Sequence, residues 1–218
     1  MPTEDATKPP ESLLARLKAP GGSPWNVPNA LSAIRLVLAI LVCGMVELGW
    51  MWTALVLFVI AASTDWIDGW WARRYQQVTK LGRILDPFVD KVIIGGAMIA
   101  LVGVDGSPVR AWMATLVVAR ELLVTSLRGM VEGQGGDFSA KQLGKWKMVL
   151  QCAAIVSALV ELGLADPPVA LRWGTRILLF AAILLTVISA IEYVLLVLRP
   201  AAAKPSSDEV SARGGNRD

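Results

Sequence analysis

The chain contains, at residues 172–198, the stretch RWGTRILLFAAILLTVISAIEYVLLVL. This run is longer than the roughly 20 apolar residues that an α-helix needs to cross the hydrocarbon core of a bilayer. A helix pairs the backbone N–H and C=O groups of a segment with one another. In lipid, a single segment outside a closed β-barrel can satisfy these groups only in this way. The stretch therefore predicts a membrane-spanning helix.

Five further apolar segments precede it. The 218-residue chain is 55% hydrophobic and 18% charged, whereas soluble domains carry about 25% charged residues. This composition allows at most about six membrane crossings. The sequence predicts an all-α, polytopic membrane protein with one six-helix domain over residues 25–199, the other helices covering approximately 30–48, 51–72, 86–104, 109–129 and 146–164.

The two ends of the chain are polar. Residues 1–24 are rich in proline and glycine and predict a tail, in which 11–18 forms a short amphipathic segment at the bilayer surface. Residues 200–218 predict a disordered C-terminal tail. We find no internal repeat of the kind that builds many transporters.

Basic residues are concentrated on one side of the predicted membrane. By the positive-inside rule, both termini and the two basic joints, after the second and the fourth apolar segments, face the cytoplasm. We therefore expect a multi-pass protein of the cell's inner membrane, with a site formed at these joints facing the cytoplasm. This distribution accounts for the net charge of +3, so no nucleic-acid partner is expected. The cytoplasmic basic residues are Lys8, Arg16, Lys18, Arg73, Arg74, Lys80, Arg83, Lys91, Arg128, Lys141, Lys145, Lys147, Arg199 and Lys204.

The second joint between apolar segments carries four aspartates. It reads TDWIDGWWARRYQQVTKLGRILDPFVDKV from residue 64 to 92. Asp65 and Asp68 are spaced i, i+3 and Asp86 and Asp90 are spaced i, i+4, so each pair lies on one face of its helix. Converging carboxylates need cations, and their hard oxygens prefer Mg²⁺ or Mn²⁺. The pattern predicts a site for two divalent ions.

The absence of histidine restricts the chemistry further. With no histidine in the chain, imidazole-based triads, zinc ligation through imidazole and phosphohistidine intermediates are excluded. Cys43 and Cys152 lie far apart in apolar runs and are expected to be core residues. Small residues and a guanidinium between the acids would admit a nucleotide or pyrophosphate: Gly69, Ala72, Arg73 and Gly82. Alternatively, the aspartates are interfacial charges paired with Arg73, Arg74, Arg83 and Lys91.

The pattern D65-x2-D68-G69-x2-A72-R73-x8-G82-x3-D86-x3-D90 resembles the complete signature of the CDP-alcohol phosphatidyltransferases. The resemblance implies a homodimeric six-helix enzyme that transfers a phosphatidyl or related group from a CDP-linked donor to an alcohol. It also implies that the four aspartates ligate two metal ions, that the first three hold the CDP diphosphate, and that Asp90 accepts the proton of the attacking hydroxyl. Asn29 and Thr79 would border the nucleotide or donor lipid.

The acceptor must be inferred from outside this signature. Arg120 and Glu121 lie inside an apolar run, and Arg128 shares a helical face with Glu121, with which we expect it to pair. Together with Lys141 and Lys145, the two arginines would suit a phosphorylated acceptor such as glycerol 3-phosphate. Alternatively, Arg120 forms only an internal ion pair, and Lys141 and Lys147 reach outward to a cytoplasmic edge.

Three flanking stretches resemble the phosphatidylglycerophosphate synthase branch of this family. They are WNVPNALSAIR at 25–35, AREL with SLRG at 119–129, and GKWK at 144–147. The resemblance implies CDP-diacylglycerol as donor and glycerol 3-phosphate as acceptor. Two alternatives stay open: a member of the same family that accepts inositol phosphate or serine, and a divalent-cation transporter that uses the aspartates for permeation.

Overall fold

The computed structural model describes residues 27–75, 80–133 and 142–198, with side chains at 30–64, 88–130, 146–195 and 197. Within these residues the chain is entirely helical apart from its turns. The helices are α2 (Val27–Glu47), α3 (Met51–Tyr75), α4 (Lys80–Val102), α5 (Ala111–Gly133), α6 (Gln142–Gly163) and α7 (Val169–Leu198). The predicted all-α class is confirmed for this part of the chain.

Each predicted apolar segment coincides with one of these helices. The main differences lie where polar residues remain helical: α4 begins at Lys80 rather than at 86, and α5 continues to Gly133 rather than ending at 129. Hydropathy marks the apolar part of a helix and not its hydrogen-bonded ends, so the predicted boundaries were too short there.

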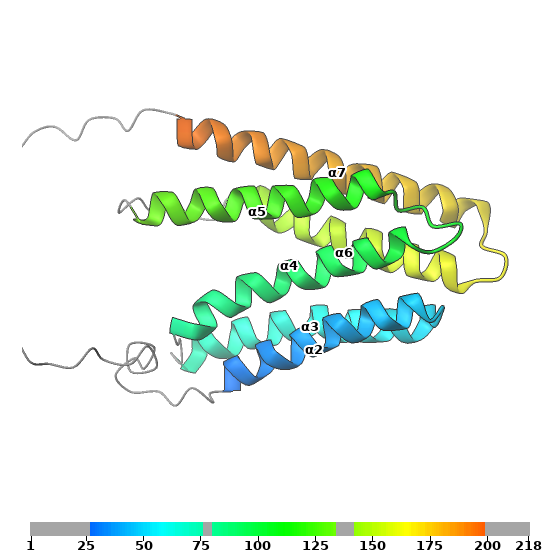
Figure 1. Ribbon diagram of the computed structural model, residues 1–218, viewed down its shortest axis with the longest axis horizontal. Helices are drawn as coiled ribbons and strands as arrows, with labels where there is room; N and C mark the ends of the chain where they lie inside the picture. Colours follow the sequence, from blue (N-terminus) through cyan, green and yellow to red (C-terminus); the bar gives the residue numbers. More distant parts are fainter. Residues whose placement is uncertain (1–26, 76–79, 134–141, 199–218) are drawn as a thin grey trace, which may run out of the picture.

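The helices run side by side and alternate in direction (Figure 1). We call the end where α3 finishes at Tyr75 and α4 begins at Lys80 the signature end. The opposite end, or turn end, holds the turns that follow α2, α4 and α6 (Figure 1). All four predicted metal-binding aspartates therefore belong to backbone segments close to the signature end.

A glycine-terminated turn joins α2 to α3 at the turn end. Gly49 has a φ of 76°, a left-handed conformation that costs glycine little. Its N–H donates to the carbonyl of Val46 at 3.0 Å, and the N–H of Trp50 donates to the carbonyl of Met45 at 2.8 Å. These two bonds form a Schellman motif, which ends α2 and lets α3 begin immediately in the opposite direction.

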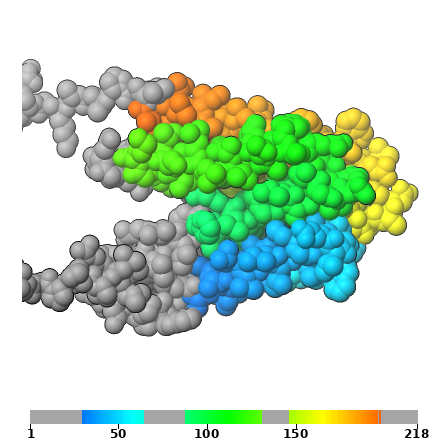
Figure 2. Space-filling view, in the orientation of Figure 1, coloured from blue at the N-terminus to red at the C-terminus, as the bar shows by residue number. Residues whose placement is uncertain are grey.

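Helix α4 lies between α2 and α5 (Figure 2). Two adjacent glycines allow both approaches: a Cβ on Gly95 would lie 3.2 Å from Cγ2 of Val118 in α5, and a Cβ on Gly96 would lie 3.2 Å from Sγ of Cys43 in α2. Small residues permit such close backbone packing in membrane proteins. The centre of the bundle is thus held by α4, which connects the N-terminal and C-terminal helices.

Large apolar side chains remain exposed along the outside of the bundle. On α7 they recur at helical spacing and form a stripe, made of Trp173, Ile177, Phe180, Leu184, Ile188, Ile191 and Leu195. A continuous apolar surface of this kind is expected where a helix faces lipid. Three described helices contain segments long and apolar enough to cross a membrane, namely Ala30–Glu47, Trp146–Gly163 and Val169–Leu195.

Candidate active site

The backbone brings the two halves of the acidic signature together. Asp65 and Asp68 lie in the last part of α3, and Asp86 and Asp90 lie in the first part of α4, which contacts α3 and runs back from it. The remaining predicted donor-site residues occupy α2 at Asn29, α3 at Gly69, Ala72 and Arg73, and α4 at Gly82. The side chains of these residues, apart from Asp90, lie outside the described part, and so does all of Thr79.

The donor set suits a hard divalent cation. Four carboxylates on neighbouring helix ends provide oxygen ligands only, which Mg²⁺ and Mn²⁺ prefer. Among the side chains that the structure describes, no three metal-binding side chains come together, because only one of the four aspartates, Asp90, is among them. The metal site therefore stays a prediction, and the positions of α3 and α4 are compatible with it.

Asp90 contacts an arginine that the sequence-based assignment had not included in the site. The Nη1 of Arg35, from α2, donates to Oδ1 of Asp90 at 2.8 Å. The Arg35 side chain is fully buried, whereas that of Asp90 is 28% exposed. A charge-assisted bond of this length restrains the position of Oδ1 and so limits how the carboxylate can turn. Arg35 therefore orients the residue to which the signature assigns proton transfer.

A second polar cluster lies between α5, α6 and α7. At its centre, Oε1 of Glu121 accepts hydrogen bonds from Nη1 of Arg120 at 3.1 Å and from Nζ of Lys147. Arg120 and Lys147 are both buried. Two cations on one carboxylate leave the group positively charged, which favours an anionic ligand nearby.

Two side chains of α7 complete this cluster. Ser189 Oγ accepts a hydrogen bond from Nη2 of Arg120 at 2.8 Å, and the hydroxyl of Tyr193 accepts one from Nη2 of Arg128 at 3.1 Å. The guanidinium carbon of Arg120 lies 5.8 Å from the centre of the Tyr193 ring, within cation–π range. The structure thus brings Arg120 and Arg128 together around one tyrosine.

The expected pairing of Glu121 with Arg128 is wrong. Glu121 binds Arg120 and Lys147, and Arg128 binds Tyr193. A shared helical face permitted the expected pair, but α6 brings Lys147 closer to the carboxylate. For Lys147, the alternative of an outward-reaching cytoplasmic edge is also wrong, because the side chain is only 6% exposed. The side chain of Lys145 and all of Lys141 lie outside the described part.

Lys91 lies within electrostatic range of both Asp90 and this second cluster. It follows Asp90 in α4 and interacts electrostatically with Asp90 and Glu121, and also with Arg120 and Arg128. Lys147 in turn interacts electrostatically with Lys91. Within this group four cations (Lys91, Arg120, Arg128 and Lys147) accompany two carboxylates (Asp90 and Glu121), which favours binding of an anion to the cluster.

Comparison with known proteins decides the class. A model of the CDP-alcohol phosphatidyltransferase family matches residues 25–202. The chain belongs to the CDP-alcohol phosphatidyltransferase family. It is therefore a phosphatidyltransferase, as the aspartate signature predicted, and the alternative of a cation transporter is not supported.

Several relatives of this phosphatidyltransferase carry the name CDP-diacylglycerol–glycerol-3-phosphate 3-phosphatidyltransferase. The protein of Bacillus subtilis is 41% identical over 138 residues, which cover 63% of this chain and 69% of the relative. The protein of Cereibacter sphaeroides is 35% identical over 147 residues, 64% of this chain and 66% of the relative. That of Salmonella choleraesuis is 32% identical over 178 residues, 78% of this chain and 93% of the relative.

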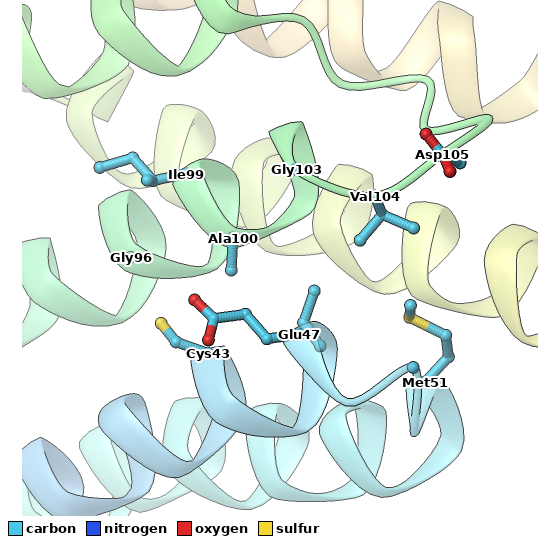
Figure 3. A pocket seen from close by; sticks show the side chains of 11 residues that line it. Cys43, Glu47, Met51, Gly96, Ile99, Ala100, Gly103, Val104 and Asp105 are labelled. Atoms are coloured by element: carbon cyan, nitrogen blue, oxygen red, sulfur yellow. The ribbon is translucent and has the colours of Figure 1, made fainter.

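Two of the pockets formed by described residues of the phosphatidyltransferase lie in different parts of the bundle. One, of about 510 Å³, opens between α2 and α4 at the turn end, with Glu47 and Asp105 among its lining residues (Figure 3). It lies at the opposite end of the bundle from the aspartates and is therefore separate from the candidate active site. The other, of about 450 Å³, lies between α3 and α6 and is lined largely by apolar side chains.

Proposed function

We propose that this phosphatidyltransferase moves the phosphatidyl group of CDP-diacylglycerol to glycerol 3-phosphate, producing phosphatidylglycerophosphate and CMP for phospholipid synthesis. The observation that carries the proposal is the cationic cluster of Arg120, Arg128 and Lys147, of which Arg120 and Lys147 are buried. An acceptor that carries its own phosphate would need such a cluster. The names of the relatives support the same donor and acceptor.

The four aspartates are proposed to hold two divalent ions, Mg²⁺ or Mn²⁺. When bound, such ions would neutralise the diphosphate of the donor and stabilise the leaving CMP. Asp65, Asp68 and Asp86 would hold the diphosphate through these ions, with Gly69, Ala72 and Gly82 leaving room for it and Arg73 donating to its oxygens. Asn29 and Thr79 would border the nucleotide or the donor lipid.

Asp90 is proposed to accept the proton of the attacking hydroxyl. A carboxylate is a weak base, so its contribution depends on being held within hydrogen-bond reach of the hydroxyl. The bond from Arg35 to Oδ1 of Asp90 at 2.8 Å supports this role, because it limits the orientations that the carboxylate can adopt. The hydroxyl oxygen then attacks the donor phosphorus, and the bond to CMP breaks.

The phosphate of the acceptor is proposed to bind near Arg120 and Arg128, with Lys141 and Lys145 completing the site. The excess of cations around Glu121 supports this assignment. Lys91 lies in range of both Asp90 and Arg128. An acceptor bound by its phosphate there would direct its other end toward Asp90.

The acyl chains of the donor are proposed to occupy the pocket between α3 and α6. Its lining includes Phe58, Ala62 and Ser63 from α3 and Met148, Cys152 and Val156 from α6. Ser63 precedes the first signature aspartate by two positions. An apolar pocket that ends so close to the acids supports a ligand with a lipid tail and a diphosphate head.

All six helices are proposed to cross the bilayer, with both termini and the signature end on the cytoplasmic side of the inner membrane. The lipid-facing stripe of α7 and the three spanning segments support this arrangement. Glycerol 3-phosphate and CDP are charged and water-soluble, so a cytoplasmic opening suits them. A homodimer is proposed from the family resemblance.

The test is an assay of the purified full-length protein with CDP-diacylglycerol, Mg²⁺ or Mn²⁺, and one alcohol at a time. Glycerol 3-phosphate should support CMP release and form phosphatidylglycerophosphate, while inositol phosphate and serine should not. Chelation of the divalent ions should stop the reaction, and either ion should restore it. Turnover with another alcohol but none with glycerol 3-phosphate would contradict the proposal.

A further inference from the structure

Tyr193 of α7 contacts both arginines of the cationic cluster. Its hydroxyl accepts the hydrogen bond from Nη2 of Arg128 at 3.1 Å, and its ring lies 5.8 Å from the guanidinium carbon of Arg120. The side chain is only 7% exposed. One uncharged residue therefore fixes two cations that come from the same helix, α5, eight positions apart.

The two guanidiniums retain donors that no described group accepts. The Nε of Arg120 and the Nε of Arg128 are both buried and lack a hydrogen-bond acceptor. Arg120 already uses Nη1 for Glu121 and Nη2 for Ser189, and Arg128 uses Nη2 for Tyr193. Buried N–H groups without acceptors are unfavourable, so an anion with several oxygens would satisfy them.

Ser189 and Tyr193 are spaced i, i+4 on α7 and so share one face. Ser189 Oγ also donates to the carbonyl of Thr186 at 3.1 Å, which orients its hydroxyl so that a lone pair can accept from Arg120. Neither residue adds charge to the site. Ser189 and Tyr193 thus orient the two arginines without adding a charge of their own.

We infer that Tyr193 is a positioning residue that sets the guanidiniums of Arg120 and Arg128 to receive the phosphate of the acceptor alcohol. This inference rests on the proposed function, because it assigns the ligand of the two arginines to the phosphate of glycerol 3-phosphate. The contacts of Tyr193 that carry the inference are those with Arg120 and Arg128. Its effect should therefore fall on binding of the acceptor and not on the chemical step or on the donor.

The test compares Tyr193→Phe with the parent protein in steady-state assays that vary each substrate in turn. Phenylalanine keeps the ring over Arg120 and removes only the hydroxyl that holds Arg128. We expect KM for glycerol 3-phosphate to rise roughly tenfold or more, because the variant loses one hydrogen bond to a charged group. The kcat and the KM for CDP-diacylglycerol should stay within about twofold.

Thr175→Val is the matched control. Thr175 is also a fully buried hydroxyl residue of α7, but it binds Ser157 of α6 at 2.7 Å and contacts neither arginine. Its loss should lower thermal stability without changing KM for glycerol 3-phosphate. Ser189→Ala is the second variant, and it should raise the same KM by releasing Arg120, even if Tyr193→Phe fails to fold.

The possible outcomes separate the inference from the proposed function. If the parent protein turns over glycerol 3-phosphate while Tyr193→Phe and Ser189→Ala keep its KM, the inference is wrong and the proposed function stands. Tyr193→Phe could instead change KM for glycerol 3-phosphate and KM for CDP-diacylglycerol equally, or Thr175→Val could show the same change as Tyr193→Phe. Either result would indicate a structural role and overturn the inference. If the parent protein does not use glycerol 3-phosphate at all, the proposed function and the inference about Tyr193 are both wrong.

Discussion

Arg35 of α2 and Asp90 of α4 are joined by a 2.8 Å ion pair that crosses from one helix to its neighbour. The arginine is fully buried and the aspartate is partly open to solvent. A buried group thus holds one carboxylate oxygen, while the Asp90 side chain as a whole stays partly exposed. The pair therefore ties the first described helix to the residue that we propose as the base.

Arg35→Lys should reduce kcat more than it affects either KM. Lysine keeps the positive charge but has no planar fork, so the Asp90 carboxylate should lose its fixed orientation. We expect kcat to fall roughly tenfold or more, as for other losses of positioning. Steady-state rates of CMP release measure this effect, with thermal unfolding as the control for folding. An unchanged kcat in a folded variant would show that orientation of Asp90 does not depend on Arg35.

Asp90→Asn should bind the donor and fail in catalysis. Asparagine is nearly isosteric but cannot accept the hydroxyl proton, so kcat should drop by about 10²-fold or more. Binding of CDP-diacylglycerol and release of CMP are measured separately on the same preparation. Asp105→Asn, at the turn end, is the matched control and should behave like the parent protein. Normal CMP release from Asp90→Asn would exclude the proposed role.

Glu121 and Lys147 should be energetically coupled. Each single change, Glu121→Gln or Lys147→Met, leaves a buried charge with fewer partners and should lower the free energy of unfolding by about 3–5 kcal/mol. The double variant should lose less than the sum of both, with a coupling of about 1–3 kcal/mol. Denaturation in mixed micelles provides these values. If the losses in free energy of unfolding of the two single variants simply add in the double variant, the proposed coupling of Glu121 and Lys147 is wrong.

The positions of the helices could be predicted from the sequence, whereas the partners of the polar residues could not. Apolar length alone located every described helix, because the bilayer imposes that length. The bond from Arg35 to Asp90 joins residues 55 positions apart, and it depends on how α2 packs against α4. Nothing in the local pattern around Arg35 indicates this partner.

The cationic cluster illustrates the same limit. Arg120 and Arg128 were predicted because charges inside an apolar run are costly and usually functional. Tyr193 and Ser189 carry no such signal, since a tyrosine and a serine in an apolar helix are common. Only the packing of α7 on α5 identifies them. The predicted pairing of Glu121 with Arg128 was wrong for a related reason. Helical periodicity compares residues of one helix only, and Lys147 belongs to another helix, α6.

The proposed orientation can be tested with single cysteines. In a background with Cys43→Ser and Cys152→Ser, Asp166→Cys introduces a thiol at a side chain that is 97% exposed in the turn after α6. A membrane-impermeant maleimide should label it in intact cells if the turn end faces outward. Ser207→Cys, in the C-terminal tail, should be labelled only after the membrane is permeabilised. Labelling of Ser207→Cys in intact cells, with Asp166→Cys protected, would reverse the orientation and place the aspartates away from the cytoplasm.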